Sequence, residues 1–355
     1  MSAEAPGRRG ILLALASAAL FGTSTPVAKA LLGTMPPLAL AGLLYAGAGL
    51  GLAAVLLIRR LVSRDPAPIA WPKRADAAWL AAAIALGGVA GPIALMSGLV
   101  TTTASAASLL LNLEAVFTAL LAWFLFRENV DRRVALGMLA IVAGGVVLAS
   151  APAGPEGVSA GTWLVALACL CWALDNNLTR RVSGSDAVAI AMLKGLVAGA
   201  VTLLLALARG APLPPATPAI AAAAVGFIGY GVSLALFVLA LRDLGTARTG
   251  AYYSVAPFFG ALLAVVVLSE PVTRQLAAAG ALMALGVWLH ATERHSHRHA
   301  HERLEHEHPH VHDEHHRHAH AFAWEGREPH SHPHVHDPLV HSHPHYPDLH
   351  HRHPH

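Results

Sequence analysis

Four charged side chains lie inside long apolar stretches of this sequence: Lys29, Glu114, Asp175 and Lys194. A charge in the apolar interior of a membrane is costly, so such residues usually pair with one another or line a path for ions or substrates. We therefore take them as the first candidates for chemistry. Lys29 also has a simpler interpretation, because it lies near the end of its stretch, where its side chain can extend to the membrane surface.

Glu114 lies about twelve residues, or about 18 Å of helix, from the charged end of its apolar stretch, which places it near the middle of a membrane. A carboxyl group at that depth can take up and release a proton during a transport cycle. Asn112 is near enough along the helix to join Glu114 in binding a polar substrate. The alternative is a structural carboxylate that pairs with a neighbouring helix, and the sequence leaves both interpretations open.

Asp175 and Lys194 lie at similar depths on consecutive apolar stretches, which predicts an ion pair. A mutually neutralising pair is a common way to hold two charges in a membrane, so a structural role is favoured. Asn176 adds polarity beside Asp175 and keeps a role in substrate binding open. Tyr252 and Tyr253 can offer hydroxyl groups or an aromatic face to an organic substrate.

Three prolines, Pro26, Pro92 and Pro257, interrupt otherwise apolar stretches and are candidates for helix breaks. Proline leaves a backbone carbonyl without its usual donor, and such carbonyls can line a cavity. Close helix packing is the default alternative. Cys169 and Cys171 are spaced like a chelate, but they lie in an apolar stretch that lacks histidine, so we interpret both as small apolar residues.

Residues 293–355 contain 23 of the 24 histidines, most of them spaced by two. Imidazole binds zinc, nickel, cobalt and copper, so this tail is expected to bind divalent metal ions. Its few apolar residues and repeated prolines predict disorder. The alternative is a low-complexity extension without a role in transport. The candidate ligands are His295, His297, His299, His301, His306, His308, His310, His312, His330, His332, His334 and His336.

The elements that must position these residues are apolar helices. Hydrophobic residues make up 55% of the chain and charged residues 13%, whereas an average soluble protein has about 25% charged residues. A helix needs about 20 apolar residues to cross a membrane. The sequence therefore predicts an all-α polytopic membrane protein with ten transmembrane helices, at 11–32, 37–58, 76–97, 104–126, 133–150, 161–180, 188–208, 217–240, 246–268 and 273–291.

Positive charges are distributed unevenly among the loops. With the N-terminus in the cytoplasm, 14 Lys and Arg residues fall in inner segments, whereas the outer loops hold only Arg209 and Arg274. The positive-inside rule then predicts a multi-pass protein of the inner (plasma) membrane with both termini cytoplasmic. Because the charges lie in short loops, they do not indicate a nucleic-acid partner.

The two halves of the apolar region resemble each other. At an offset of 142, the segment 117–130 (FTALLAWFLFRENV) aligns with 259–272 (FGALLAVVVLSEPV), Glu128 falls on Glu270, and Gly87 falls on Gly229. Each half has five predicted helices, an odd number, so the second copy must enter the membrane from the opposite side. Inverted repeats of this kind are typical of transporters. The predicted regions are a first five-helix repeat at 8–150, a second at 160–292 and the tail at 293–355.

These features resemble the EamA-type members of the drug/metabolite transporter (DMT) superfamily. The resemblance rests on Ala107–Glu128 (ASLLLNLEAVFTALLAWFLFRE), on its second copy at 251–270 (AYYSVAPFFGALLAVVVLSE), and on the order of such segments along the chain. The family often has a proline after the polar residue of the fourth helix. The second copy keeps Pro257 but the first has Ala115, so a kink is expected in the ninth helix and left open in the fourth.

The resemblance implies a secondary transporter, and we predict export of a small organic metabolite across the inner membrane by alternating access. The alternative is an exporter of divalent zinc, nickel or cobalt that uses the tail to collect or sense the ion. A membrane-anchored metal buffer is a third and weaker hypothesis. No nucleophile–base set or phosphate-binding loop is recognisable, so we predict no enzyme and no required cofactor. The expected partners are a small-molecule substrate, the lipid bilayer and metal ions at the tail, and no oligomeric state is predicted.

Overall fold

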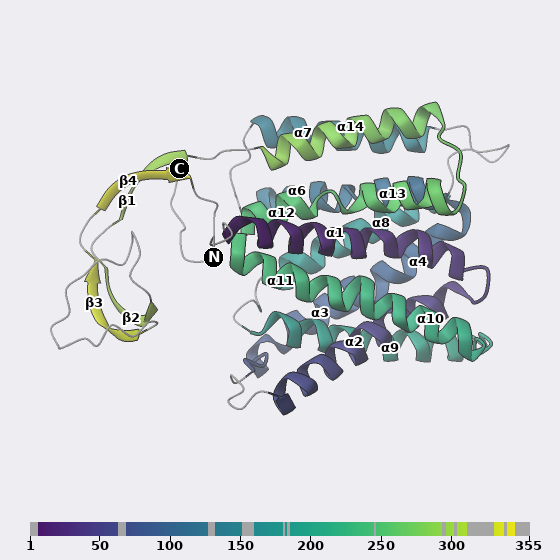
Figure 1. Ribbon diagram of the computed structural model, residues 1–355, viewed down its shortest axis with the longest axis horizontal. Coiled ribbons are helices and arrows are strands. Elements are labelled where there is room, and N and C mark those ends of the chain that lie inside the picture. Colours follow the sequence, from purple (N-terminus) through teal and green to yellow (C-terminus); the bar gives the residue numbers. More distant parts are fainter. Residues whose placement is uncertain are drawn as a thin grey trace, which may run out of the picture. The chain divides into compact units, whose positions relative to one another are not determined.

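The computed structural model (Figure 1) describes helices between residues 6 and 292 and four strands between residues 296 and 344. The chain divides into two compact units, Met1–Glu293 and Arg294–His355. The described ranges are 6–62, 69–126, 132–150, 160–179, 182, 185–244, 246–292, 296–301, 304–310, 330–336 and 339–344.

The described secondary structure of the first unit is helical. Its first half contains α1 (Pro6–Leu31), α2 (Pro37–Val62), the 3₁₀ turn η1 (Arg74–Asp76), α3 (Ala77–Ala83), the π-helix η2 (Ile84–Ala90), α4 (Gly91–Thr101), α5 (Ala104–Leu110), α6 (Leu113–Phe126) and α7 (Arg132–Ala149). Its second half contains α8 (Ala160–Thr179), α9 (Ala187–Ala208), α10 (Ala216–Gly226), the π-helix η4 (Phe227–Val232), α11 (Ser233–Leu244), α12 (Thr246–Tyr253), α13 (Ala256–Val267) and α14 (Arg274–Ala291).

Eight helical stretches among the described residues are long and apolar enough to cross a membrane. The other two predicted spans coincide with α8 and α14, which are 20 and 18 residues long and carry more polar residues. The number ten therefore stays a prediction. Large apolar side chains such as Leu50, Phe124, Leu204 and Val266 are exposed on the outside of the bundle, as lipid contact requires.

Helices of corresponding position in the two halves pack together. In Figure 1, α7 lies beside α14, and α2 packs against α9. The contact of α4 with α8 has a counterpart in that of α11 with α1, and the contact of α6 with α8 has one in that of α13 with α1. Exchanging the two halves thus converts each of these contacts into itself or into another of the observed contacts.

The two halves also share irregular backbone at equivalent places. The π-helices η2 and η4 begin at Ile84 and Phe227, and the fourth predicted span is broken between Leu110 and Leu113 as the ninth is between Tyr253 and Ala256. The first half thus has a break without a proline at the position of Ala115.

Side-chain chemistry accounts for where these breaks fall. The Asn112 side chain donates from Nδ2 to the Leu109 carbonyl at 2.9 Å, where it competes with helical bonding. Pro92 and Pro257 lie in the first turns of α4 and α13, where a missing N–H is tolerated. Pro26 does not break its helix, because α1 continues through it. Pro26 removes only one helical hydrogen bond, so the Gly22 carbonyl lacks its usual donor. Gly22 packs closely on Gly260 of α13.

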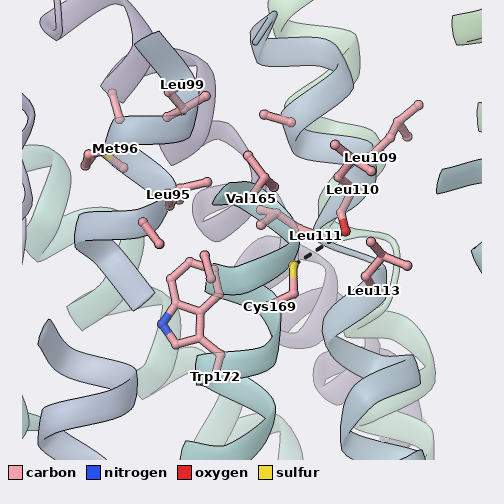
Figure 2. Close-up of a cluster of buried hydrophobic side chains, with 14 of the residues drawn as sticks. Leu95, Met96, Leu99, Leu109, Leu110, Leu111, Leu113, Val165, Cys169 and Trp172 are labelled. Carbon is pink, nitrogen blue, oxygen red and sulfur yellow. Dashed lines mark hydrogen bonds between the residues drawn. The ribbon is translucent and has the colours of Figure 1, made fainter. Parts of the chain in front are cut away.

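The apolar core lies where α4, α5 and α6 meet α8 (Figure 2). Leu95, Leu99 and Leu110 pack with Val165 and Trp172, and all five side chains are buried. Cys169 is part of the same cluster, and both cysteines are buried free thiols, which agrees with their interpretation as small apolar residues.

The second unit contains two antiparallel pairs of strands. Strand β1 (Ser296–His301) pairs with β4 (Leu339–Pro344), and β2 (Leu304–His310) pairs with β3 (His330–His336). The prediction of a disordered tail is therefore wrong for these four segments. A histidine spacing of two is also the side-chain period of a strand, so the pattern is compatible with a ladder. Among the candidate ligands, His295 and His312 lie outside the described residues.

Candidate functional site

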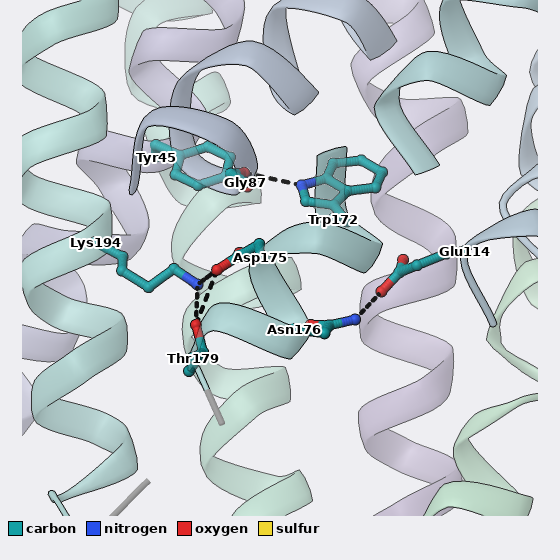
Figure 3. A network of polar contacts seen from close by, with 8 residues as sticks. All are labelled: Tyr45, Gly87, Glu114, Trp172, Asp175, Asn176, Thr179 and Lys194. Atoms are coloured by element: carbon teal, nitrogen blue, oxygen red, sulfur yellow. Dashed lines mark hydrogen bonds and ion pairs between the residues drawn. The ribbon is translucent and has the colours of Figure 1, made fainter. Parts of the chain in front are cut away.

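Asp175 of α8 and Lys194 of α9 form the predicted ion pair (Figure 3). Lys194 Nζ lies 2.6 Å from both Asp175 Oδ1 and Asp175 Oδ2. The Thr179 hydroxyl, one turn further along α8, donates to Asp175 Oδ1 at 2.9 Å. The aspartate side chain is 8% exposed and the lysine side chain 18%. The ammonium is therefore the more accessible half of the pair.

Asn176 directs its side chain to a different neighbour, because consecutive helical residues point about 100° apart. Its Nδ2 donates to Glu114 Oε1 of α6 at 2.8 Å. Glu114 is partly exposed. We call Glu114, Asp175, Asn176, Thr179 and Lys194 the polar layer. Its three α8 residues lie within about one helical turn. They connect α8 to Glu114 of α6 and to Lys194 of α9.

A single backbone carbonyl, that of Gly87, accepts two side-chain hydrogen bonds above this layer. Tyr45 Oη and Trp172 Nε1 each donate to Gly87 O at 2.9 Å. The carbonyl is free because the local helix has π spacing: Gly91 N–H donates to Leu86 O, five residues earlier, and the next donor in that series would be Pro92, which has no N–H. Gly87 also has to be glycine, since a methyl group there would overlap the Asp175 carboxylate.

A cavity of about 440 Å³ adjoins the polar layer. Asn176, Thr179 and Lys194 line it, together with Tyr45 of α2 and Tyr230 of η4. Its lining also includes Ser185 and Ala187, where α9 begins, so the cavity extends from the middle of the bundle to the end at which α8 terminates. Glu114 is connected to the cavity through Asn176.

The two cavity tyrosines belong to a series of packed aromatic rings. Tyr45 lies 5.6 Å from Tyr230, and Tyr230 lies 5.7 Å from Phe21, between ring centroids. Phe21 is also 5.7 Å from Tyr253, which in turn packs on Phe237 at 4.9 Å. This series links α1, α2, η4, α11 and α12 and borders the cavity at Tyr45 and Tyr230.

One family model matches nearly the whole helical unit. The EamA-like transporter family matches residues 8–150 and again residues 159–292. The chain belongs to the EamA-like transporter family. It is thus a polytopic membrane protein, and the family model matches each half of the helical unit separately.

Two further similarities agree with membership of the EamA-like family. An uncharacterized transporter of Methanothermobacter thermautotrophicus (strain Delta H) is 29% identical over 297 residues, which cover 79% of this chain and 85% of that protein. A protein of known crystal structure, 23% identical, superimposes with a TM-score of 0.56 over 79% of this chain and 94% of its own. The latter likeness concerns the fold alone.

Several predicted site residues of this EamA-like protein lie away from the cavity. Asn112 does not contact Glu114; it is buried at the break between α5 and α6, where it bonds to the Leu109 carbonyl and to Met283 Sδ. Tyr253 packs within the aromatic series, and neither Tyr252 nor Tyr253 lines the cavity. Residues two apart on a helix point about 200° apart, so Asn112 and Glu114 face different neighbours.

Sequence reasoning missed Tyr45 and Tyr230, the tyrosines that do line the cavity. The chain has five tyrosines, and a tyrosine in the middle of an apolar span must satisfy its hydroxyl within the protein. Tyr45 does so by donating to Gly87 O. A tyrosine within an apolar span is uncommon, and this could have indicated from the sequence that Tyr45 and Tyr230 lie beside buried polar atoms.

Lys29 is tied to the protein rather than extended to the membrane surface. Its Nζ donates to the carbonyls of Leu99 and Val100 in the last turn of α4. Nearby, the Glu270 carboxylate accepts from Ala104 N at 2.7 Å and from Ser105 N at 2.8 Å, at the start of α5. A cation at a helix C-terminus and an anion at a helix N-terminus both complement the helix dipole. The two residues thus hold the α4–α5 corner from both sides.

Proposed function

We propose that this EamA-like transporter exports a small organic metabolite across the inner membrane by alternating access, with both termini in the cytoplasm. The observation that carries the proposal is the cavity beside the polar layer, which extends to the end of the bundle where α8 terminates and α9 begins. The excess of Lys and Arg in the loops supports a cytoplasmic location for that end. A substrate would then enter the cavity from the cytoplasm, as export requires.

Filling the cavity is expected to stop transport. Ala48, 6% exposed, lines the cavity, whereas Leu50, two residues away on the same helix, is 63% exposed on the outer surface. In cells that express the wild-type protein, untargeted metabolite analysis of the medium should reveal compounds that accumulate outside. Ala48→Trp should abolish that accumulation and Leu50→Trp should preserve it at equal membrane abundance. Equal accumulation in both variants would remove the cavity as the substrate site.

Glu114 is assigned the proton-coupling role in this proposal. It is a carboxyl group inside the membrane that reaches the cavity through Asn176, and intramembrane carboxyl groups commonly relay protons. Glu114→Gln keeps the size of the side chain and an acceptor oxygen for Asn176, but it cannot exchange a proton. We expect the variant to lose the pH dependence of transport.

The measurement is flux of an exported compound, identified as above, in proteoliposomes over a series of pH values. Glu114→Asp is the matched control, because it retains a titratable group and should retain pH dependence. A Glu114→Gln protein with wild-type rate and wild-type pH response would show that Glu114 is structural only.

Metal binding by the tail is a second candidate function, supported by the register of the strands. Residues two apart share one face of a ladder, and directly opposite residues have Cβ atoms about 4.5–5.5 Å apart. In both ladders most histidines lie opposite another histidine, whereas His301 and His336 lie opposite Leu339 and Leu304. The cross-strand pairs are His297–His343, His299–His341, His306–His334, His308–His332 and His310–His330.

Such paired imidazoles suit zinc, nickel, cobalt or copper, and a divalent-metal exporter would use them to collect or sense the ion. We expect the purified protein to bind Zn²⁺ through these pairs. Replacing His306, His308, His332 and His334 by alanine should lower Zn²⁺ affinity by about tenfold or more, since even groups that merely orient a metal ligand contribute that much.

The matched control replaces an equal number of histidines that occupy no described strand: His315, His316, His350 and His351. Isothermal titration with Zn²⁺ should separate the two variants. An equal loss in both would mean that histidine content, not strand register, determines metal binding. Unchanged cellular tolerance of Zn, Ni and Co after deletion of residues 293–355 would exclude a role for the tail in metal export.

A further inference from the structure

The chemistry that the cavity presents to a ligand is set mainly by Lys194. Among the described residues that line the cavity, Lys194 is the one with a formal charge. Its partner Asp175 is not part of the lining and has the less exposed side chain. The pair is thus oriented with its positive end toward the cavity and its negative end toward the Gly87 backbone.

Lys194 also has donor capacity left after it pairs with Asp175. An ammonium has three N–H donors and no acceptor. Asp175 supplies two oxygens at 2.6 Å, whereas the third nearby oxygen, Thr179 Oγ1, lies at 3.4 Å, beyond the usual length of such a bond. The Thr179 hydroxyl donates to Asp175 Oδ1 and accepts this long bond from Lys194. An acceptor in the cavity at ordinary hydrogen-bond distance can therefore take the third N–H from Thr179.

The rest of the lining fits an apolar body with polar atoms at one end. Leu52, Ile190 and Leu234 contribute apolar surface, and Tyr45 and Tyr230 contribute aromatic surface. Asn176 and Ser185 add neutral polar groups near Lys194 and at the start of α9. A ligand site of mostly apolar walls with a few placed polar groups is the usual form of a small-molecule pocket.

We propose that the cavity binds amphipathic organic carboxylates, whose carboxylate accepts a hydrogen bond from Lys194 while the apolar body lies against Tyr45, Tyr230 and Leu52. The proposal rests on the proposed function, of which it specifies the substrate class. Asp175 remains bonded to Lys194 in the loaded site and tunes how much positive charge the ligand meets. Removing the charge of Asp175 should therefore strengthen binding of an anion.

The test uses three compounds that differ only in their polar end: 4-phenylbutyrate, 4-phenylbutanamide and 4-phenylbutylamine. Their binding to the purified full-length protein is measured by ligand-dependent thermal shift and by isothermal titration. We expect wild-type protein to prefer the carboxylate to the amide, and to bind the amine least. Asp175→Asn should bind the carboxylate more tightly than wild type does. A protein without Lys194 should bind it about tenfold or more weakly, because hydrogen bonds to charged groups contribute that much.

For the lysine-free protein we choose Lys194→Met/Asp175→Leu, which leaves no unpaired charge, and Lys194→Arg is the conservative control that should keep the preference. Equal binding of the acid and the amine, a preference that survives in the lysine-free protein, or absence of binding by all three compounds would overturn the proposal. These outcomes concern substrate class alone. Failure of the proposed function would appear separately, as unchanged export in Ala48→Trp cells.

Discussion

Replacing Lys194 by methionine is expected to lower the free energy of unfolding by about 3–5 kcal/mol, the effect of removing one partner from a buried ion pair. The Asp175 side chain is 8% exposed and receives both of its short contacts from Lys194. Without the ammonium, it keeps only the bond from the Thr179 hydroxyl. A carboxylate that is largely buried and has lost its cation is strongly destabilising.

The double variant Lys194→Met/Asp175→Leu separates charge pairing from packing. Both charges are gone, so most of the lost stability should return, as it does when buried ion pairs are exchanged for apolar residues. Reversible unfolding of the detergent-solubilised proteins would provide the comparison. If the double variant is as unstable as the single one, the aliphatic part of Lys194 matters more than its charge, and the ion pair is not what holds α8 against α9.

Gly87→Ala is expected to destabilise the protein by about 1–3 kcal/mol, the usual effect of adding a methyl group to a closely packed interior. The new methyl group would overlap the Asp175 carboxylate and force it away from Lys194. The same change would disturb the carbonyl that accepts from Tyr45 and Trp172. Substrate transport should therefore fall along with stability.

Gly145→Ala provides the control, since the nearest side-chain atom to an added methyl there lies at 3.6 Å, an ordinary contact distance. Alanine favours a helix over glycine by up to about 1 kcal/mol, so this variant should be as stable as wild type or more stable. Thermal unfolding and export assays on both variants would decide the matter. Equal behaviour of the two would show that close approach at Gly87 is not required.

The sequence was sufficient to predict features that depend on the type of a residue and on its depth in the membrane. Asp175 and Lys194 could be paired because two opposite charges at similar depth in a membrane have few other partners. The offset of 142 that aligns Gly87 with Gly229 also aligns η2 with η4 to within one residue. Such features follow from the energetics of polar groups in an apolar environment, which sequence composition reveals directly.

Features that depend on helix rotation and on irregular backbone could not be predicted in the same way. The contact of Asn176 with Glu114 requires knowing which face of α8 meets α6. The Gly87 carbonyl becomes an acceptor because π spacing and Pro92 coincide, and neither alone would free it. Asn112 was assigned to the site because it is close to Glu114 in sequence, but residues two apart do not share a helix face, and its side chain bonds to the Leu109 carbonyl instead.

The prediction of a disordered tail was wrong for its four strand segments for a different reason. Low apolar content argues against a packed core. It does not tell whether two polar segments that are far apart in sequence pair as strands. The register of His306 with His334 arises between residues 28 apart in sequence, and a composition argument does not contain such information.

The hydrogen bonds of Lys29 and Glu270 at the α4–α5 corner have a consequence for how a bound molecule would leave the protein. The corner lies at the end where Gly98 packs on Gly161 at the start of α8, opposite the end that the cavity reaches. If the helices separate here, the Lys29 ammonium, the Glu270 carboxylate and the helix termini lose their hydrogen-bond partners. Unpaired polar groups in an apolar environment are costly. In the proposed cycle, we expect water to enter the corner before the helices part, so that wetting of this end precedes release on the far side of the membrane.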